Sequence, residues 1–467
     1  MISQRLSAAR HWLLLGGLGL LVAAGVLYAT SLDAPANYDE GVYLASLDAL
    51  THGQVLGTDV YASQPPGFYM LLRAIALLPG DGVAAIRAGF LLLALAGLVA
   101  GFAIGRRVAG NWGGVAAAGL LAVTAPYPIQ AARIQADTAS VALSLCSIAV
   151  LMAAGHRSGR YALAGALAGT ALSVKLLAAP VVAPIAVLLV ARRSWRAAGA
   201  VAAGAAAVWG VLLGLTAGGL DELWRSVVTD HADARDLGPS LADNLHRVLL
   251  HPLDWATPAG VVVPIGLVCA AVLSHRVETL ALGAWIAATA AFIVYQRPLL
   301  DHHFVMLAAV LAVTAGAGLG AAVARIPRPA RLAAAGVAAL ALVAGMAQEA
   351  RRLDRVGNDE LPSVRWAAGE LRERTRPDAL VASDLPIVAY LADRRMPGNL
   401  VDTSFVRLDS GSLTNAEILE TLEPERIPAV AVGRLFAKRP ELMGELRARY
   451  PRQIRSPGIT VRLAPAP

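Results

Sequence analysis

Eleven long apolar runs constrain the fold of this chain more than any other feature of its sequence. A helix advances about 1.5 Å per residue, so about 20 mostly apolar residues carry it across the hydrocarbon layer of a membrane. Since 57% of the residues are hydrophobic and only 16% are charged, the composition also excludes an ordinary soluble protein. We therefore expect a polytopic α-helical membrane protein with about 11 transmembrane helices. The runs occupy residues 11–30, 83–105, 113–129, 137–155, 161–174, 176–191, 197–217, 257–274, 279–296, 303–323 and 331–348.

The distribution of arginine predicts the orientation of these helices. Loops on the cytoplasmic side are enriched in arginine and lysine, and here every second gap carries arginine. The alternation holds if the fifth and sixth runs, separated by Lys175, cross separately. The N-terminus is then cytoplasmic and the chain after residue 349 is extracytoplasmic, as expected for a protein of the cytoplasmic (inner) membrane. These arginines are Arg5, Arg10, Arg106, Arg107, Arg157, Arg160, Arg192, Arg193, Arg196, Arg276, Arg325, Arg328 and Arg331.

The first run has two interpretations. A basic start followed by an apolar stretch with small residues at its end is typical of a signal peptide, but also of a first membrane helix. The apolar length of residues 12–30 favours a helix that stays in the membrane, and further spans follow it.

Acids, histidines and aromatic residues gather in the gaps that face outward. These gaps are the predicted external loops 31–82, 126–137, 218–256 and 295–303, together with the break at Lys175. The predicted membrane domain, residues 1–348, thus carries its unusual polar residues on one face.

From residue 349 to residue 467 the composition becomes that of a soluble domain. "ALVASD" and "PAVAVGRL" are short β-rich runs, and "LPSVRWAAGELRERT", "NAEILETL" and "PELMGELRARY" have helical character. The alternation predicts a small extracytoplasmic α/β domain. No glycine-rich phosphate loop stands between a strand and a helix, so nothing indicates nucleotide binding.

The net charge of +7 does not indicate a nucleic-acid partner, because the arginines are scattered between apolar runs and form no basic stripe. The two cysteines, Cys146 and Cys269, lie inside apolar runs without a partner at metal-binding or redox spacing. We interpret them as small buried hydrophobic residues.

Asp39 and Glu40 follow the first run directly, in "NYDEGVYLASL". One interpretation is structural, with Asp39 capping a helix and Glu40 in its first turn. The other is functional, since Asp39 and Tyr43 share a helical face just outside the membrane. Downstream, "QPPGF" places Gln64 before a proline pair that ends one element and begins a helix lying on the membrane.

Charged residues recur at the next external gaps. Arg133 and Asp137 are four apart and form either an intrahelical salt bridge or part of a functional site, because ionisable groups at a membrane boundary are costly. Lys175 either extends its ammonium group to the interface or meets a phosphate.

The remaining polar candidates lie in two external loops. Arg297, His302 and His303 stand at the mouth of a late span, where a lipid head group would sit. His231 and Arg235 belong to the 218–256 loop, whose polar residues are more often simply solvated. Adjacent histidines on a helix point to different faces, so His302 and His303 are weak evidence for a metal site.

Together these motifs resemble those of the GT-C glycosyltransferases, and among them bacterial members of the protein O-mannosyltransferase and lipid A aminoarabinose transferase families. The motifs are DExxY after the first span, "TDVYASQPPGF", an aspartate at the start of the fourth span, a lysine between two short spans and "DHH" before a late span. The resemblance covers about residues 10–325 and is most specific over 37–69.

The resemblance implies an inverting transfer of a sugar, hexosyl or pentosyl, from a polyprenyl-phosphate donor to a glycan, lipid or protein acceptor of the cell envelope. Asp39 would be the catalytic carboxylate that accepts the proton of the acceptor hydroxyl. Asp137 would be the second catalytic acid, orienting the acceptor or helping to hold a metal. Positive charge would stabilise the leaving phosphate. Further substrate-binding candidates are Glu40, Tyr43, Gln64, Arg133, Lys175, His231, Arg235, Arg297, His302 and His303.

One departure from the family pattern affects the metal. Aminoarabinose transferases carry an acid and a lysine just before the proline pair, where this chain has Ser63 and Gln64. The metal ligands are therefore unknown, and a divalent metal such as Mg²⁺ or Mn²⁺ stays an open alternative.

Two other classes of protein compete with the enzyme. A multi-span lipid or glycan transporter or flippase would also carry charged residues, but it predicts repeated halves with broken helices at mid-depth, and the sequence shows no such repeat. A non-catalytic envelope assembly subunit would tolerate Asp39→Asn.

Overall fold

The computed structural model describes residues 2–80, 82–254, 256–358 and 362–465. The chain forms two compact units, each built from three segments. The helical unit contains Met1–Asp33, Ile75–Leu212 and Ser240–Val356, and the mixed unit contains Ala34–Ala74, Leu213–Pro239 and Gly357–Pro467. Residues 81 and 255, inside the predicted loops 31–82 and 218–256, lie outside the described residues.

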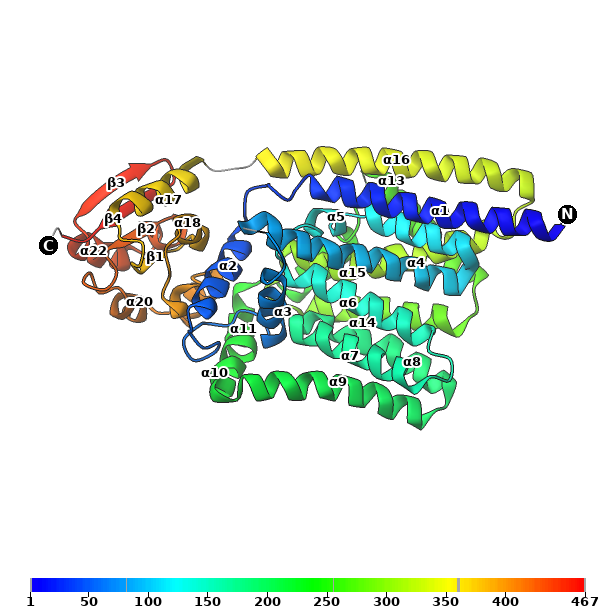
Figure 1. Cartoon of the computed structure of the whole chain (residues 1–467), viewed down its shortest axis with the longest axis horizontal. Coiled ribbons are helices and arrows are strands. Elements are labelled where there is room, and N and C mark those ends of the chain that lie inside the picture. The colour runs from blue at the N-terminus through cyan, green and yellow to red at the C-terminus, as the bar shows by residue number, and fades with distance from the viewer. Residues whose placement is uncertain (1, 81, 255, 359–361, 466–467) are drawn as a thin grey trace. The chain divides into compact units, whose positions relative to one another are not determined.

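Most helices of the helical unit lie within the apolar runs of the sequence, whereas helix Leu241–Leu250 is amphipathic and falls in the predicted loop 218–256 (Figure 1). Five described helices are long and apolar enough to cross a membrane, and further apolar helices are shorter. A multi-span membrane protein is confirmed in these terms, while the number of crossings and the side of the N-terminus stay predictions. The elements are α1 (Ile2–Ala29), α4 (Gly82–Val123), α5 (Tyr127–Gln130), α6 (Ala136–Met152), α7 (Ser158–Val174), the 3-10 helix η1 (Leu176–Val181), α8 (Val182–Arg192), α9 (Trp195–Leu215), α12 (Leu241–Leu250), α13 (Pro258–Leu273), α14 (Val277–Tyr295), the 3-10 helix η5 (Asp301–Phe304), α15 (Val305–Val323) and α16 (Arg328–Asn358).

Helix α4 covers two predicted spans and turns back between them. Ala109 and Gly110 leave helical geometry there, and Gly110 has a φ of 69°, which glycine adopts without strain. A Cβ added to Gly105 would stand 2.3 Å from the carbonyl oxygen of Gly113, so the two arms touch backbone to backbone. Small residues permit this approach, as they do in other helix pairs within membranes.

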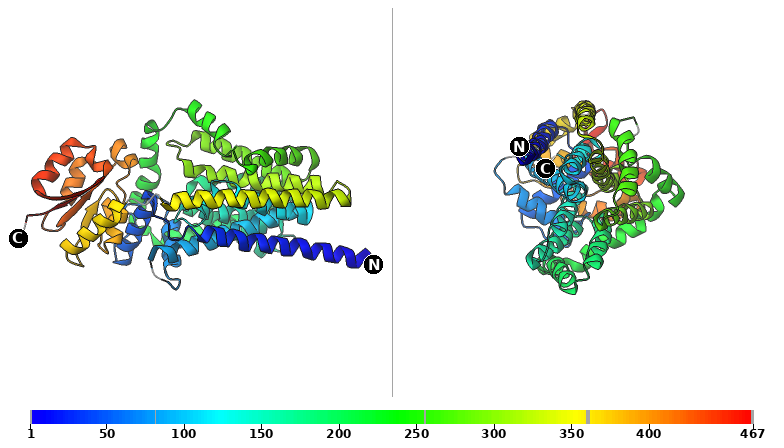
Figure 2. Two further views of the ribbon diagram at one scale, coloured as in Figure 1. Left: turned by 90° about the horizontal axis from the view of Figure 1, so that it is seen from above. Right: turned by 90° about the vertical axis from the view of Figure 1, so that its right-hand side faces the viewer.

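Helix α15 forms the centre of the helical unit. It packs against α4, α13 and α14, and 94% of its most apolar stretch is buried. Figure 1 shows α4, α6 and α15 side by side, and the right-hand view of Figure 2 looks along the helices. Gly316 and Gly320 leave no room for a Cβ against α4, which explains why small residues recur along this helix.

The mixed unit joins the C-terminal part of the chain with two segments from the predicted external loops. Its strands form one sheet in the order β1-β2-β4-β3, with β1 parallel to β2 and the other pairs antiparallel. The elements are α2 (Tyr38–Thr51), α3 (Pro66–Ala76), η2 (Ala217–Gly219), α10 (Leu220–Trp224), the π-helix η3 (Arg225–Thr229), α11 (Asp230–Asp233), η4 (Ala234–Leu237), α17 (Pro362–Arg374), β1 (Val381–Ser383), α18 (Pro386–Leu391), η6 (Gly398–Leu400), α19 (Phe405–Ser410), α20 (Asn415–Thr421), β2 (Ala429–Val432), α21 (Arg434–Ala437), α22 (Pro440–Arg449), β3 (Arg452–Ser456) and β4 (Ile459–Leu463).

The two β-rich runs of the sequence contain β1 and β2, and both strands are buried throughout. The β3–β4 hairpin was not predicted. Buried and exposed residues do not alternate regularly along its strands, because β3 is largely exposed at the sheet edge and β4 is mostly buried. A glycine with positive φ, Gly458 at 83°, forms its turn and was the available signal.

Candidate active site

The N-terminus of α2 is capped by Asn37 and Glu40. The Asn37 side chain accepts a hydrogen bond from the Glu40 backbone N–H at 2.9 Å, and the Glu40 carboxylate accepts one from the Asn37 N–H at 3.2 Å. This reciprocal pair is a capping box, and Glu40 is fully buried in it. The interpretation of Asp39 as the cap is therefore wrong, because the residue two positions earlier already supplies the acceptor.

Asp39 is the second residue of α2 and is half-buried. Its carboxylate is thus not required to cap the helix, unlike that of its neighbour Glu40. The adjacent acids differ in burial and in their part in the cap, which favours a functional role for Asp39 over Glu40.

The two most specific motifs of the sequence touch each other. The Tyr43 ring meets the Phe68 ring edge to face, with centroids 4.5 Å apart. Helix α3 begins at Pro66, as the proline pair predicts. Just before it Gln64 is nearly buried, and the Tyr69 hydroxyl accepts the Ser63 N–H at 3.0 Å. DExxY and QPPGF therefore form one structural element, with Tyr43 at its aromatic contact.

Within the mixed unit, α2 rests directly on the C-terminal segment. A Cβ added to Gly41 would stand 2.7 Å from the backbone nitrogen of Ile387 in α18. The Tyr38 hydroxyl accepts the Thr403 N–H at 3.0 Å and donates to Asp402 at 3.4 Å. Burial raises the pKa of Tyr38 well above 10, with Asp402 acting in the same direction, so the phenol keeps its proton. These contacts lie on both sides of Asp39 in the sequence.

The 213–239 segment is anchored to the same unit through Tyr61. The Tyr61 hydroxyl donates to Asp230 at 3.0 Å, and the Arg407 guanidinium lies 3.6 Å from the centre of the Tyr61 ring. The predicted residue His231 lies beside this contact and has its Nδ1 3.0 Å from the Ser226 carbonyl, which it can reach only as a donor. Arg235 is exposed.

A second polar group forms in the helical unit, around Asp137. Asp137 is the second residue of α6 and is fully buried. Lys175 lies in extended backbone between α7 and η1, so the break expected at this residue is present. Its Nζ is 3.3 Å from Asp137 Oδ2, and its side chain is only 7% exposed. A buried ion pair thus joins two residues that the sequence analysis treated separately.

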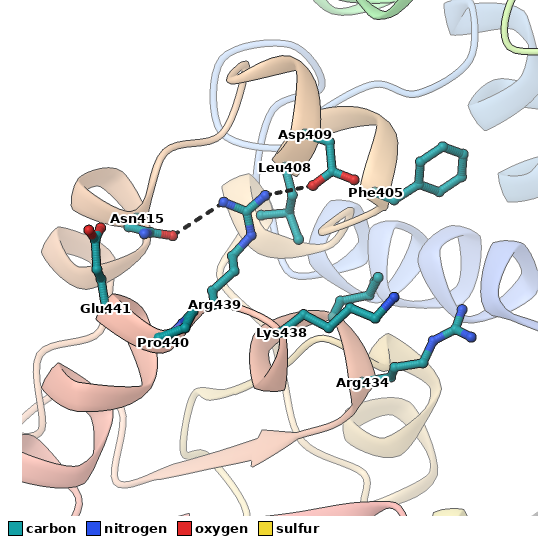
Figure 3. A pocket seen from close by; sticks show the side chains of 10 residues that line it. Phe405, Leu408, Asp409, Asn415, Arg434, Lys438, Arg439, Pro440 and Glu441 are labelled. Atoms are coloured by element: carbon teal, nitrogen blue, oxygen red, sulfur yellow. Dashed lines mark hydrogen bonds and ion pairs between the residues drawn. The ribbon is translucent and has the colours of Figure 1, made fainter. Parts of the chain in front are cut away.

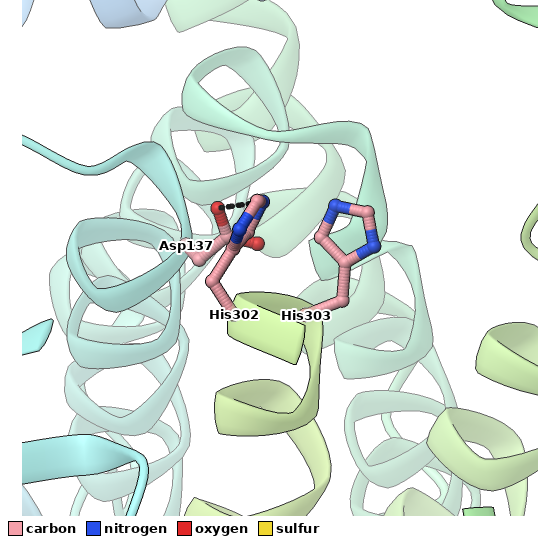
Figure 4. A group of neighbouring side chains, drawn as sticks. All are labelled: Asp137, His302 and His303. Carbon is pink, nitrogen blue, oxygen red and sulfur yellow. Dashed lines mark ion pairs between the residues drawn. The ribbon is translucent and has the colours of Figure 1, made fainter. Parts of the chain in front are cut away.

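His302 and His303 complete this group (Figure 4). His302 Nε2 lies 3.9 Å from Asp137 Oδ2, and the two imidazole rings meet nearly at right angles with centroids 4.5 Å apart. The expectation that the adjacent histidines point apart is wrong, because both bring a nitrogen within 4.8 Å of the Asp137 carboxylate. They lie on the short 3-10 turn η5 rather than on an α-helix.

Asp137, His302 and His303 have the donor types of a divalent metal site, but their present contacts suit it poorly. The Leu300 N–H donates to Nδ1 of His303 at 3.2 Å, so the neutral ring carries its proton on Nε2 and has no free lone pair. Metal-binding histidines use the opposite arrangement, in which the second nitrogen donates. The Lys175 ammonium already neutralises Asp137. The hydrogen-bond donors of Lys175 and His303 suit an anion better than a metal.

Two predicted cations lie outside this ion pair. Arg133 lies in the turn between α5 and α6, and α6 begins only at Ala136. Arg133 and Asp137 therefore do not share a helical face, which excludes the alternative of an intrahelical salt bridge and leaves the functional alternative as a prediction. Arg297 is half-buried, and its Nε has no hydrogen-bond partner among the described residues.

Arg247 is a residue that the sequence analysis did not select. Its guanidinium donates to the Leu299 carbonyl at 2.6 Å and to Asp301 at 2.7 Å, and it lies 5.5 Å from the centre of the Phe304 ring. It thereby anchors the turn that carries the histidines. Only its place on the polar side of the amphipathic helix α12 was visible in the sequence, since its partners lie more than 50 residues away.

Comparisons with known proteins agree with this architecture. A family model described as dolichyl-phosphate-mannose-protein mannosyltransferase matches residues 63–215. No curated protein sequence matches the chain. The crystal structure of ArnT from Cupriavidus metallidurans in the apo state has a TM-score of 0.66 at 16% identity, covering 97% of this chain and 98% of that one.

The same Cupriavidus protein bound to undecaprenyl phosphate has a TM-score of 0.65 at 16% identity, with the same coverage of both chains. The Archaeoglobus fulgidus oligosaccharyltransferase tethered with an acceptor peptide has a TM-score of 0.55 at 13% identity, covering 89% of this chain and 69% of that one. These likenesses show the fold. The resemblance to GT-C glycosyltransferases that the motifs predicted is confirmed.

Proposed function

We propose that this chain, which has the fold of GT-C membrane glycosyltransferases, transfers a sugar from a polyprenyl-phosphate donor to an acceptor of the cell envelope. One observation at the start of α2 carries the proposal: Asn37 and Glu40 form the cap of the helix, and Asp39 is not part of it. The half-buried carboxylate of Asp39 belongs to the most specific motif of the chain.

Asp39 is proposed as the general base. An acceptor hydroxyl is a weak nucleophile, and a carboxylate that removes its proton as the new glycosidic bond forms lowers the barrier. The C1–O bond to the donor phosphate breaks as the acceptor oxygen attacks from the opposite face, so the anomeric configuration inverts. The proton passes to Asp39, and the bond electrons leave with the polyprenyl phosphate.

Lys175, His302 and His303 are proposed to bind the donor phosphate. A departing phosphate needs positive charge or hydrogen-bond donors placed before the reaction begins. Lys175 supplies an ammonium group, and the neutral His303 ring carries its proton on Nε2 because its Nδ1 accepts the Leu300 N–H. We assign Asp137 a positioning role, since its fully buried carboxylate holds Lys175 at 3.3 Å.

We further propose that the reaction takes place on the external face of the cytoplasmic membrane. The arginine pattern supports a cytoplasmic N-terminus, which puts α2, the η5 turn and the C-terminal segment outside. A lipid-linked donor suits this face, because activated nucleotide sugars are confined to the cytoplasm.

The proposal is tested by transfer assays with purified full-length protein in detergent micelles. The protein is incubated with radiolabelled polyprenyl-phosphate sugars and an envelope extract, and the labelled product is identified by mass spectrometry. Label should move to one acceptor class with wild-type protein and stay on the donor with Asp39→Asn. Undiminished transfer by the Asp39→Asn protein would overturn the assignment of the base.

A further inference from the structure

The C-terminal part of the mixed unit contains a pocket of about 660 Å³ that the proposed reaction leaves unexplained (Figure 3). It lies among α19, the start of α20, α21 and the start of α22. Pockets of about 300–1,000 Å³ are typical of sites for small organic ligands. The volume therefore suits a molecule larger than a single inorganic ion.

One of the three cations that line the pocket is already neutralised. The Arg439 guanidinium donates to Asp409 at 2.9 Å and reaches the Asn415 side chain at 3.5 Å. This arrangement fixes the side chain in place. The remaining charges of the lining are Arg434, Lys438 and Glu441.

Arg434 and Lys438 are exposed, and neither side chain makes a hydrogen bond or ion pair with any residue that the structure describes. They are four residues apart, at the start of α21 and at its C-terminal cap, a spacing at which like charges repel each other. In Figure 3 both side chains extend toward the Phe405 end of the pocket, whereas Glu441 lies at the opposite end beyond Arg439. One end of the pocket is thus cationic.

The cationic end is bordered by apolar surface. The Phe405 side chain is 38% exposed, and Leu408 and Leu435 also line the pocket. An anionic group between Arg434 and Lys438 would relieve their repulsion, and the planar guanidinium can bind two oxygens of a phosphate or carboxylate at once. The rest of such a ligand would lie against Phe405.

We propose that this pocket binds the anionic group, phosphate or carboxylate, of a saccharide. We further propose that this saccharide is part of the acceptor, which would then be an anionic envelope glycan. In this respect the inference rests on the proposed function. The binding itself does not require turnover and can be measured alone.

Binding is measured by microscale thermophoresis with full-length protein in uncharged detergent. The probes are glucose 6-phosphate and glucuronic acid, with glucose as the neutral reference. Wild-type protein should bind at least one anionic probe saturably and glucose not at all, and added salt should weaken the binding. The double variant Arg434→Gln/Lys438→Gln should lose affinity by about tenfold or more, since it removes two charge-assisted contacts.

The matched control is Arg447→Gln/Arg452→Gln, which removes two exposed arginines of the same region outside the pocket. It should bind as the wild type does, and so should Asp39→Asn, which is expected to slow transfer only. Equal loss in both double variants would show a general charge effect and overturn the site.

A lipid source of the anion is distinguished by a second arm with nanodiscs that contain phosphatidylglycerol. Pocket-dependent binding of these nanodiscs without binding of either soluble sugar would overturn the saccharide assignment. If Asp39→Asn still transfers sugar while the pocket variants lose binding, the proposed base is wrong and the pocket stands.

Discussion

Asp39 and Asp137 hold the same local position in two different helices. Each is the second residue of its helix, Asp39 in α2 of the mixed unit and Asp137 in α6 of the helical unit. Asp39 is half-buried beside a complete capping box. Asp137 is fully buried, and its Oδ2 lies 3.3 Å from Nζ of Lys175. No side-chain hydrogen bond caps the start of its helix.

The difference shows that position in a helix does not decide what a carboxylate does. A buried carboxylate needs a counter-charge, and Lys175 supplies it, so Asp137 is committed to holding another residue. Asp39 does not cap its helix and is only half-buried, and we propose it as the group that accepts the acceptor's proton. We therefore expect variants at the two aspartates to fail in different ways.

The largest effect is expected for the rate of transfer at Asp39. Asp39→Asn keeps the shape of the side chain but removes the base, so turnover should fall about a hundredfold or more with little change in thermal stability. Glu40→Gln is the matched control, because glutamine still completes a capping box. It should keep most of the turnover, and an equal loss at both positions would contradict the division of labour at α2.

At Asp137 the expected failure is one of stability. Lys175→Met leaves a buried carboxylate without its partner, and the free energy of unfolding should fall by about 3–5 kcal/mol. Thermal unfolding in detergent, followed by circular dichroism, measures it. The double variant Lys175→Met/Asp137→Leu should recover part of this loss because no charge stays buried. A single variant as stable as the wild type would argue against the ion pair.

A smaller loss of turnover is expected when the contact between α2, which carries Asp39, and α18 is disturbed. Gly41→Val places side-chain atoms where Ile387 N already lies 2.7 Å from a Cβ, so α2 must shift away from α18. Overpacking of this kind costs about 1–3 kcal/mol. Turnover should fall more than the amount of folded protein does. Gly369→Ala in α17 meets nothing within 4 Å and should leave both quantities unchanged.

The smallest effect is expected on removing metal ions. If the Asp137 group is an ion pair with anion-binding neighbours, dialysis against EDTA should leave turnover unchanged. Loss of activity on dialysis, and its restoration by Mg²⁺ or Mn²⁺, would show that the reaction needs a metal and would contradict this expectation.

Local signals of the sequence predicted part of this arrangement. The proline pair marks the start of α3, and the isolated Lys175 marks a break between helices. Both could be predicted because a proline or a lone charge influences the backbone within a few residues. The pairing of Asp137 with Lys175 joins residues far apart in the chain and depends on how α6 and α7 pack.

Errors arose where neighbouring residues competed for one role. Asn37, Asp39 and Glu40 are all suitable near a helix start, and only the backbone geometry shows that Asn37 is the cap. Arg133 seemed to share a helix with Asp137, but α6 begins one residue before the aspartate. The contact between Arg247 and the η5 turn had no local signal at all.

The contrast between arginine and lysine in this chain has a practical consequence. The sequence contains only two lysines, and the structure buries Lys175 while exposing Lys438 at the anion pocket. Above neutral pH an amine-reactive dye should therefore modify Lys438 in preference to the other side chain. Once any α-amino group has been blocked, Lys438 thus offers a site for a fluorescent reporter beside the pocket, without the introduction of a cysteine.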